Sequence, residues 1–197
     1  MKKNQQIAMR ILISLSLLLL TAFALVGCSE LTAPTASTES QAYSEMWNPQ
    51  PGDMINGHEV PLLEEGYWES HYGPMVNPAG LPPRTFRVGP QGGDLSFGPH
   101  HLIIPQGAIN GQIWITLSNG SLTGLAIDCN PSPYQFNAAV TLVTSYAGTQ
   151  YEGDDDPPLS IIYMAPDGSL ETLPSVVNSS LSTLTAQTNH FSRYIVG

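Results

Sequence analysis

Basic residues are scarce in this sequence, and lysine is absent beyond residue 3. After Arg10 the chain holds only Arg84, Arg87 and Arg193, whereas all 16 acidic residues lie after residue 28. Proteins bind nucleic acid largely by neutralising phosphates with lysine and arginine. The shortage therefore excludes a nucleic-acid partner. It also excludes attachment to anionic headgroups through a basic surface.

The sequence also lacks an apolar run long enough to span a membrane. The longest run, residues 11–26, falls short of the roughly 20 apolar residues that a spanning helix needs. Residues 1–10 carry three basic residues and no acid, and a short apolar run follows them. This order is typical of a signal peptide, so residues 1–27 are predicted to be removed from the mature protein.

The last residues of this segment, Leu25-Val26-Gly27-Cys28, resemble the lipobox of bacterial lipoprotein precursors. The resemblance implies cleavage between Gly27 and Cys28 and diacylglycerol on the Cys28 thiol. Two or three acyl chains hold a protein firmly on a membrane, whereas one does not. The expected location is the cell envelope outside the cytoplasm, and Ser29 agrees with outer-membrane sorting in a two-membrane cell. An uncleaved anchor and an ordinary signal peptide are the alternatives.

Only two cysteines occur, Cys28 and Cys129. If Cys28 carries lipid, Cys129 has no partner for an intrachain disulfide. Cys129 is therefore predicted to be a small buried core residue, the alternative being a reactive or intermolecular thiol.

Two segments without clear periodicity follow Cys28. Residues 28–42 are rich in Ser, Thr, Ala and Glu and are predicted to be a disordered tether. Residues 43–83 mix aromatic residues with proline, glycine and acids, which predicts an irregular segment. Its aromatics are expected to be pinned onto the neighbouring domain, and a flexible stalk is the alternative.

From Arg84 onward, proline and glycine recur often, and no helix of ordinary length is predicted. Short β-rich runs alternate with turn signals such as Asn119-Gly120 and Asp167-Gly168. The fold class is therefore all-β, an antiparallel two-sheet sandwich of roughly 8–10 short strands over residues 84–197, preceded by a signal helix and the tether. Strands are expected at residues 84–88, 94–98, 101–105, 112–118, 122–127, 138–146, 160–165, 170–174, 182–188 and 191–196. Expected core residues are Trp114, Phe136, Ile161 and Tyr163.

Three motifs in this region resemble the ZU-type domain of ankyrins and netrin receptors. They are Gly92-Gly93-Asp94-Leu95, Leu102–Ala108 and Ile113–Thr116, and Phe136 followed by Ala139–Leu142 agrees with the second half of that domain. Ala139 stands where the family usually has proline. The resemblance covers roughly residues 86–197 and implies a β-sandwich that serves as a binding or mechanical module. Fold alone does not settle function.

The tripeptide His190-Phe191-Ser192 resembles the site at which some ZU-domain proteins cut themselves. In that chemistry Ser192 Oγ attacks the carbonyl of Phe191, and His190 assists the proton transfer. The alternative is an ordinary last strand, with Phe191 packed inside and His190 bonded to a backbone group.

Metal and cofactor signals are weak, and no cofactor is predicted. Asp154, Asp155 and Asp156 are calcium candidates, with Glu152 and Asp128 as possible further ligands, but a solvated loop fits the run better because it lacks the spaced pattern of a calcium loop. His100 and His101 are adjacent, so in a strand they point to opposite faces and do not share an ion.

Three functions follow from these observations. The favoured one is a lipid-anchored envelope lipoprotein that displays a non-catalytic β-sandwich for protein contacts or envelope architecture. The second is glycan binding, with Tyr67, Trp68 and Tyr72 as a stacking platform beside acids. The third is self-cleavage between Phe191 and Ser192. The expected partners are the membrane, through lipid on Cys28, and an unidentified protein or glycan.

Overall fold

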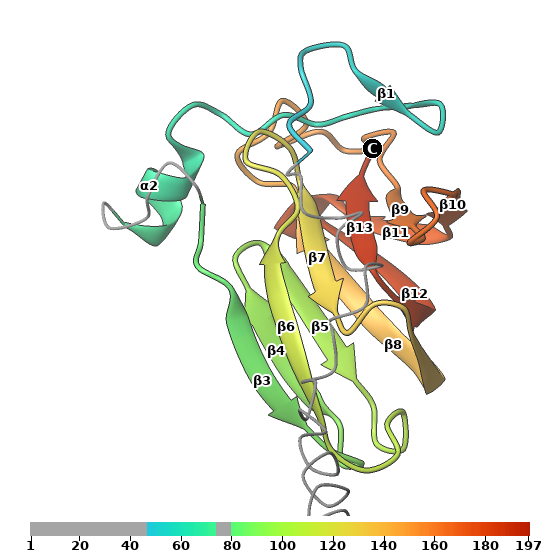
Figure 1. Ribbon diagram of the computed structural model, residues 1–197. Coiled ribbons are helices and arrows are strands. Elements are labelled where there is room, and N and C mark those ends of the chain that lie inside the picture. Colours follow the sequence, from blue (N-terminus) through green and yellow to red (C-terminus); the bar gives the residue numbers. More distant parts are fainter. Residues whose placement is uncertain (1–46, 74–79) are drawn as a thin grey trace, which may run out of the picture. The chain divides into compact units, whose positions relative to one another are not determined.

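The computed structural model describes residues 47–73 and 80–197, and most of these residues form antiparallel strands (Figure 1). One sheet contains β3 (Arg84–Val88), β6 (Ile113–Asn119), β7 (Ala126–Asn130), β9 (Ile161–Met164), β10 (Leu170–Leu173) and β13 (Arg193–Val196). The other contains β4 (Gly93–Phe97), β5 (His100–Ile104), β8 (Tyr134–Ser145), β11 (Ser175–Asn178) and β12 (Thr183–Phe191).

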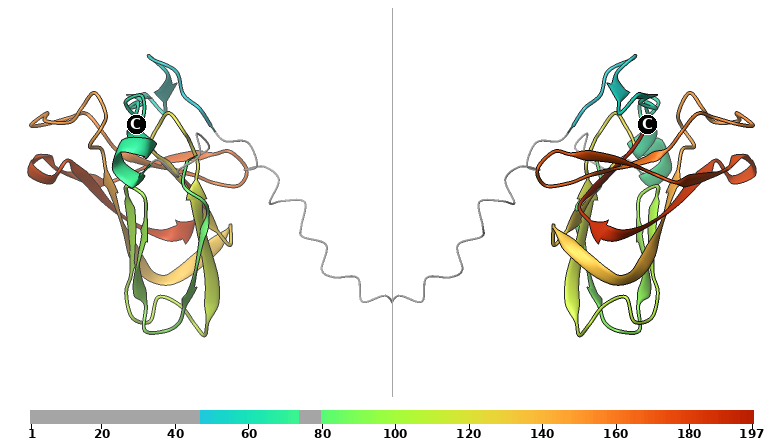
Figure 2. Two further views of the ribbon diagram at one scale, coloured as in Figure 1. Left: turned by 90° about the vertical axis from the view of Figure 1, so that its left-hand side faces the viewer. Right: turned by 90° about the vertical axis from the view of Figure 1, so that its right-hand side faces the viewer.

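The strand orders are β10-β9-β13-β7-β6-β3 in the six-stranded sheet and β11-β12-β8-β5-β4 in the five-stranded sheet. Figure 2 shows strands of the two sheets as two facing layers. The predicted all-β, two-sheet sandwich is confirmed.

Alternation along the strands places every second side chain in the core between the sheets. In β5, for example, His100, Leu102 and Ile104 are buried, whereas His101 and Ile103 are exposed. The core gathers side chains from both sheets, and it includes Phe136, Ile161 and Tyr163, as predicted. The buried Cys129 is also part of it, which confirms that prediction.

Trp114, however, is not a core residue. It is 64% exposed and lies on the outer side of β6, so the prediction was wrong. Ile115 and Leu117 in the same strand are fully buried. Because Trp114 is one residue out of step with them, the pleat of the strand sends it to the opposite face.

Several strand boundaries also differ from the prediction. The strand expected at residues 122–127 lies later, at Ala126–Asn130, and β11 was not predicted at all. The run expected at 191–196 is divided, since β12 ends at Phe191 in one sheet and β13 begins at Arg193 in the other. Ser192 is therefore the point at which the chain crosses between the sheets.

Glycine is required at the turn before β4. Gly92 has a φ of 75°, and a Cβ there would collide with the backbone of Ile104 and Pro105. The first glycine of the Gly92-Gly93 motif thus has a local steric cause.

Residues 47–73 pack onto the sandwich and contain some regular structure. They form a hairpin of β1 (Met54–Ile55) and β2 (His58–Glu59), and then the short helix α2 (Tyr67–Tyr72). A second apolar cluster lies where this segment meets the outer side of the six-stranded sheet, and its buried members are Ile55, Val60, Ala126, Ile162 and Ile195. The segment is thus held against the domain.

None of the helices in residues 47–73 and 80–197 is long and apolar enough to cross a membrane. The predicted signal peptide, Gly27, Cys28 and the tether lie outside the described residues.

Candidate functional site: a groove beside helix α2

A groove of about 640 Å³ runs between the start of α2 and the residues that follow β6. Its lining includes Tyr67 and Trp68 from the helix, Leu122 and Thr123 from the loop before β7, and three glutamates. It is larger than the cavity of about 370 Å³ between Pro51 and Gln150. The groove therefore joins two segments that lie more than 50 residues apart in the sequence.

Specific hydrogen bonds fix the two walls of the groove. The Trp68 indole N–H donates to the Leu122 carbonyl at 2.9 Å, and the Leu63 N–H donates to the Thr123 carbonyl at 2.8 Å. Gly66 precedes the helix with a φ of 76°, which allows the chain to turn into α2. These contacts hold the groove in one geometry before any ligand arrives.

The aromatic residues of α2 do not form one flat platform. The Tyr67 and Trp68 rings meet edge to face, with an interplanar angle of 83°, and Tyr72 is inclined to both. Tyr67 is buried, and this burial raises the pKa of its phenol. Trp68 is half-buried and lies in the groove wall, so of the two aromatic residues that line the groove it is the one open to a ligand. Tyr72 is exposed, but it does not line the groove.

Glu64, Glu65 and Glu69 give the groove its charge. All three are exposed, and no basic residue is among the lining residues. Their carboxylates can accept hydrogen bonds from hydroxyl or amino groups, and they repel anionic ligands. An aromatic wall beside hydrogen-bond acceptors suits a ligand with one apolar face and several hydroxyl groups.

The predicted self-cleavage residues lie at the crossing between the sheets. Phe191 is fully buried, and its ring packs edge to face on Phe136 at 5.3 Å. The Ser192 hydroxyl accepts a hydrogen bond from Ser132 Oγ at 3.0 Å. The His190 ring packs against Tyr163, and within the described residues no hydrogen bond joins its imidazole to Ser192. The nucleophile and its expected base are close in sequence but not paired.

The calcium candidates Asp154, Asp155 and Asp156 are exposed in the loop before β9. The two possible further ligands are engaged elsewhere, because Glu152 accepts a hydrogen bond from the Gly148 N–H and Asp128 binds Arg193. Within residues 47–73 and 80–197, no group of three or more His, Cys, Asp or Glu side chains is placed to hold a metal ion.

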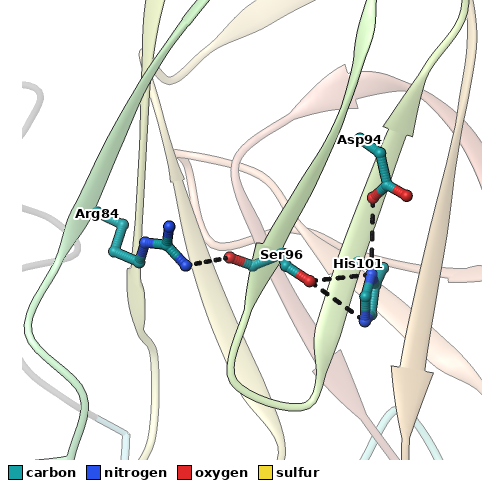
Figure 3. A network of polar contacts seen from close by, with 4 residues as sticks. All are labelled: Arg84, Asp94, Ser96 and His101. Atoms are coloured by element: carbon teal, nitrogen blue, oxygen red, sulfur yellow. Dashed lines mark hydrogen bonds and ion pairs between the residues drawn. The ribbon is translucent and has the colours of Figure 1, made fainter.

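A polar network on the outer side of β4 and β5 was missed from the sequence (Figure 3). Ser96 pairs directly with His101, and Ser96 Oγ lies 3.1 Å from His101 Nδ1. Asp94 Oδ1 approaches the same nitrogen at 3.6 Å, which is beyond hydrogen-bond range. Ser96 Oγ also lies 3.3 Å from His101 Nε2. A catalytic triad needs a carboxylate that accepts a hydrogen bond from the imidazole and so orients it, and Asp94 is too far away to do this, so the network is not a triad.

A buried ion pair was also missed. Arg193 lies opposite Asp128 across β13 and β7, with Nε 2.5 Å from Oδ1 and Nη2 2.8 Å from Oδ2. The side chains are only 5% and 13% exposed. The pairing places Arg193, the last of the three arginines that follow Arg10, inside the fold rather than on a binding surface.

Comparison with known proteins adds no relative. No family model matches this chain, and no curated protein does. The resemblances to the lipobox and to the ZU-type domain therefore stay predictions from their motifs.

Proposed function

We propose that this protein is a lipid-anchored lipoprotein of the cell envelope whose β-sandwich is a non-catalytic binding module. The basic start, the short apolar run and the LVGC sequence ending at Cys28 support the anchor. The acidic chain after Cys28 supports it as well, because such a chain has no basic surface for anionic headgroups. In a cell with two membranes, Ser29 favours the outer one.

The groove beside α2 is the observation that carries the binding function. It is formed by hydrogen bonds already in place, it exposes part of Trp68, and it is surrounded by carboxylates. Among ligand classes it favours a glycan, since sugar rings have apolar faces that stack on an indole and hydroxyls that donate to carboxylates. The glutamates favour neutral or amino sugars over uronic acids or phosphorylated sugars.

A glycan array followed by calorimetric titration of the best glycan tests this proposal. Trp68→Ala should weaken binding about fivefold to tenfold, because a stacked ring contributes on the order of 1 kcal/mol. Glu69→Gln keeps the ring and should weaken binding less. Trp114→Ala removes an exposed tryptophan far from the groove lining and is the matched control. Equal losses in the two tryptophan variants, or no loss in either, would contradict the groove as the site.

Self-cleavage is the weaker alternative for the C-terminal strand. The hydrogen bond between Ser132 and Ser192 and the packing of His190 on Tyr163 favour an uncleaved chain. A cut would break the covalent link between β12 and β13 and would leave β13 held between β7 and β9 by non-covalent contacts alone.

A further inference from the structure

We infer that the free edge of β3 is a docking site for an extended acidic peptide segment, which would add a strand to the six-stranded sheet. Among residues 47–73 and 80–197, β3 ends that sheet and pairs with β6 on one side only. An edge strand presents unpaired backbone N–H and C=O groups, and strand addition uses these groups for affinity. In Figure 1, β3 (green) forms the outer margin of its sheet.

Charge distinguishes β3 from the other edges of the sandwich. The edge strands β4 and β10 carry Asp94 and Glu171, and β11 carries no charged residue. β3 carries Arg84 and Arg87, which are both exposed. Because Arg193 is buried against Asp128, Arg84 and Arg87 of β3 are the two exposed arginines among the described residues.

The side chains around Arg87 form a small interaction surface. Its guanidinium lies 6.0 Å from the centre of the Trp114 ring and donates to the Gln112 side chain. Trp114 is the most exposed aromatic ring in the sandwich and stands directly opposite Arg87 in the strand pairing. Tryptophan and arginine are the residue types most enriched in energetically dominant contacts of protein interfaces.

The neighbouring edge strand, β4 of the five-stranded sheet, is less open to a partner. Arg84 donates from Nη1 to the Ser96 carbonyl at 3.2 Å, so it covers a backbone acceptor of β4 (Figure 3). This contact also fixes the guanidinium of Arg84 at the edge of the sandwich, where its charge acts on any segment that approaches β3. Both arginines therefore favour a partner for β3 that carries negative charge.

A second copy of this chain is a poor occupant. Antiparallel pairing of β3 with its counterpart would bring Arg87 of both copies onto one face, and like charges on one face of a strand pair are destabilising. An acidic extended peptide instead gains backbone hydrogen bonds and opposite charges together. Glutamate at alternate positions would lie on the face that carries Arg87 and Trp114.

Fluorescence anisotropy with the full protein and a labelled peptide of alternating valine and glutamate tests the inference. The peptide should bind, and binding should weaken at high salt. Two comparison peptides should fail to bind, one with lysine in place of glutamate and one with alternate backbone amides N-methylated. Binding of the N-methylated peptide with unchanged affinity would overturn strand addition.

Variants separate the β3 edge from general charge. Arg87→Ala should weaken binding about fivefold, as the loss of an exposed ion pair does. Val176→Glu changes the net charge by the same amount on the edge strand β11 and should leave the affinity unchanged. Equal losses in both variants, or equally strong competition by a single-stranded oligonucleotide, would overturn the inference. The groove has no lining residue in β3 or β6, so Trp68→Ala should leave peptide binding intact.

Discussion

Arg193→Ala should lower the free energy of unfolding by about 3–5 kcal/mol, which is the usual cost of removing one partner from a buried ion pair. The Asp128 side chain is only 13% exposed in the native structure, and the substitution removes the bidentate partner of its carboxylate. Asp128→Asn should also be costly, because it removes the negative charge that the guanidinium binds at both Nε and Nη2. Urea denaturation of each variant, followed by far-ultraviolet circular dichroism, measures the loss.

The control is the double variant Asp128→Leu/Arg193→Met, which replaces both charges by apolar groups. It should recover most of the stability lost in the single variants, since a well-packed apolar pair avoids the desolvation of two charges. Single variants that each lose less than about 1 kcal/mol would mean that the pair is solvated rather than buried.

Acidification from pH 7 to pH 5 should cost about 2 kcal/mol of stability through His100 alone. His100 is 3% exposed, and burial is the main cause that lowers its pKa from 6.5 to about 3, with the neighbouring His101 adding to it. The folded protein therefore keeps this imidazole neutral down to about pH 3, whereas the unfolded chain binds a proton below about pH 6.5. Protonation of the unfolded state lowers the free energy of unfolding as the pH falls between these values.

Two variants of adjacent histidines isolate this effect. His100→Leu removes the buried imidazole and its hydrogen bond to Thr144, so its stability should change little between pH 7 and pH 5, whatever its value at pH 7. His101→Leu alters the exposed neighbour and should retain the slope. Denaturation curves at several pH values measure both, and an unchanged slope in His100→Leu would contradict the assignment.

Much of the sandwich follows from local sequence because alternation and turn residues act over a few positions. The error at Trp114 was avoidable on the same grounds. Thr116 shares its parity and is polar, whereas Ile115 and Leu117 are apolar, so the strand pattern itself assigns Trp114 to the outer face. The prediction placed Trp114 in the core because the indole is large and apolar, although the two-residue alternation of the strand points it outward.

The crossing at Ser192 was harder to predict. Every residue from Phe191 to Gly197 is buried, so no alternation marks the place at which one strand ends and the next begins. Tyr194 and Val196 lie in the core between the sheets, and Ile195 lies on the outer side of β13, which residues 47–73 cover. Both sides of β13 are therefore apolar, and the sequence shows no alternation there. Only the register, with Phe191 opposite Tyr134 and Arg193 opposite Asp128, separates the two strands.

The groove required contacts that no local pattern contains. Its walls come from α2 and from Leu122-Thr123, and the hydrogen bond from Trp68 to Leu122 spans 54 residues. The sequence did indicate aromatic residues beside acids in residues 64–72, and this pattern predicted glycan binding. It did not indicate that Tyr67 is buried or that Trp68 keeps one side in the groove.

Intact mass spectrometry of the protein extracted from cell envelopes tests the central proposal most directly. We expect one species that begins at Cys28, carries the added mass of two or three acyl chains on a glyceryl group, and retains Ser192–Gly197. Cys28→Ala should yield neither this species nor a membrane-bound mature chain. A mature chain without lipid, or a chain that still carries residues 1–27, would contradict the lipid anchor, and the loss of Ser192–Gly197 would instead show a cut between Phe191 and Ser192.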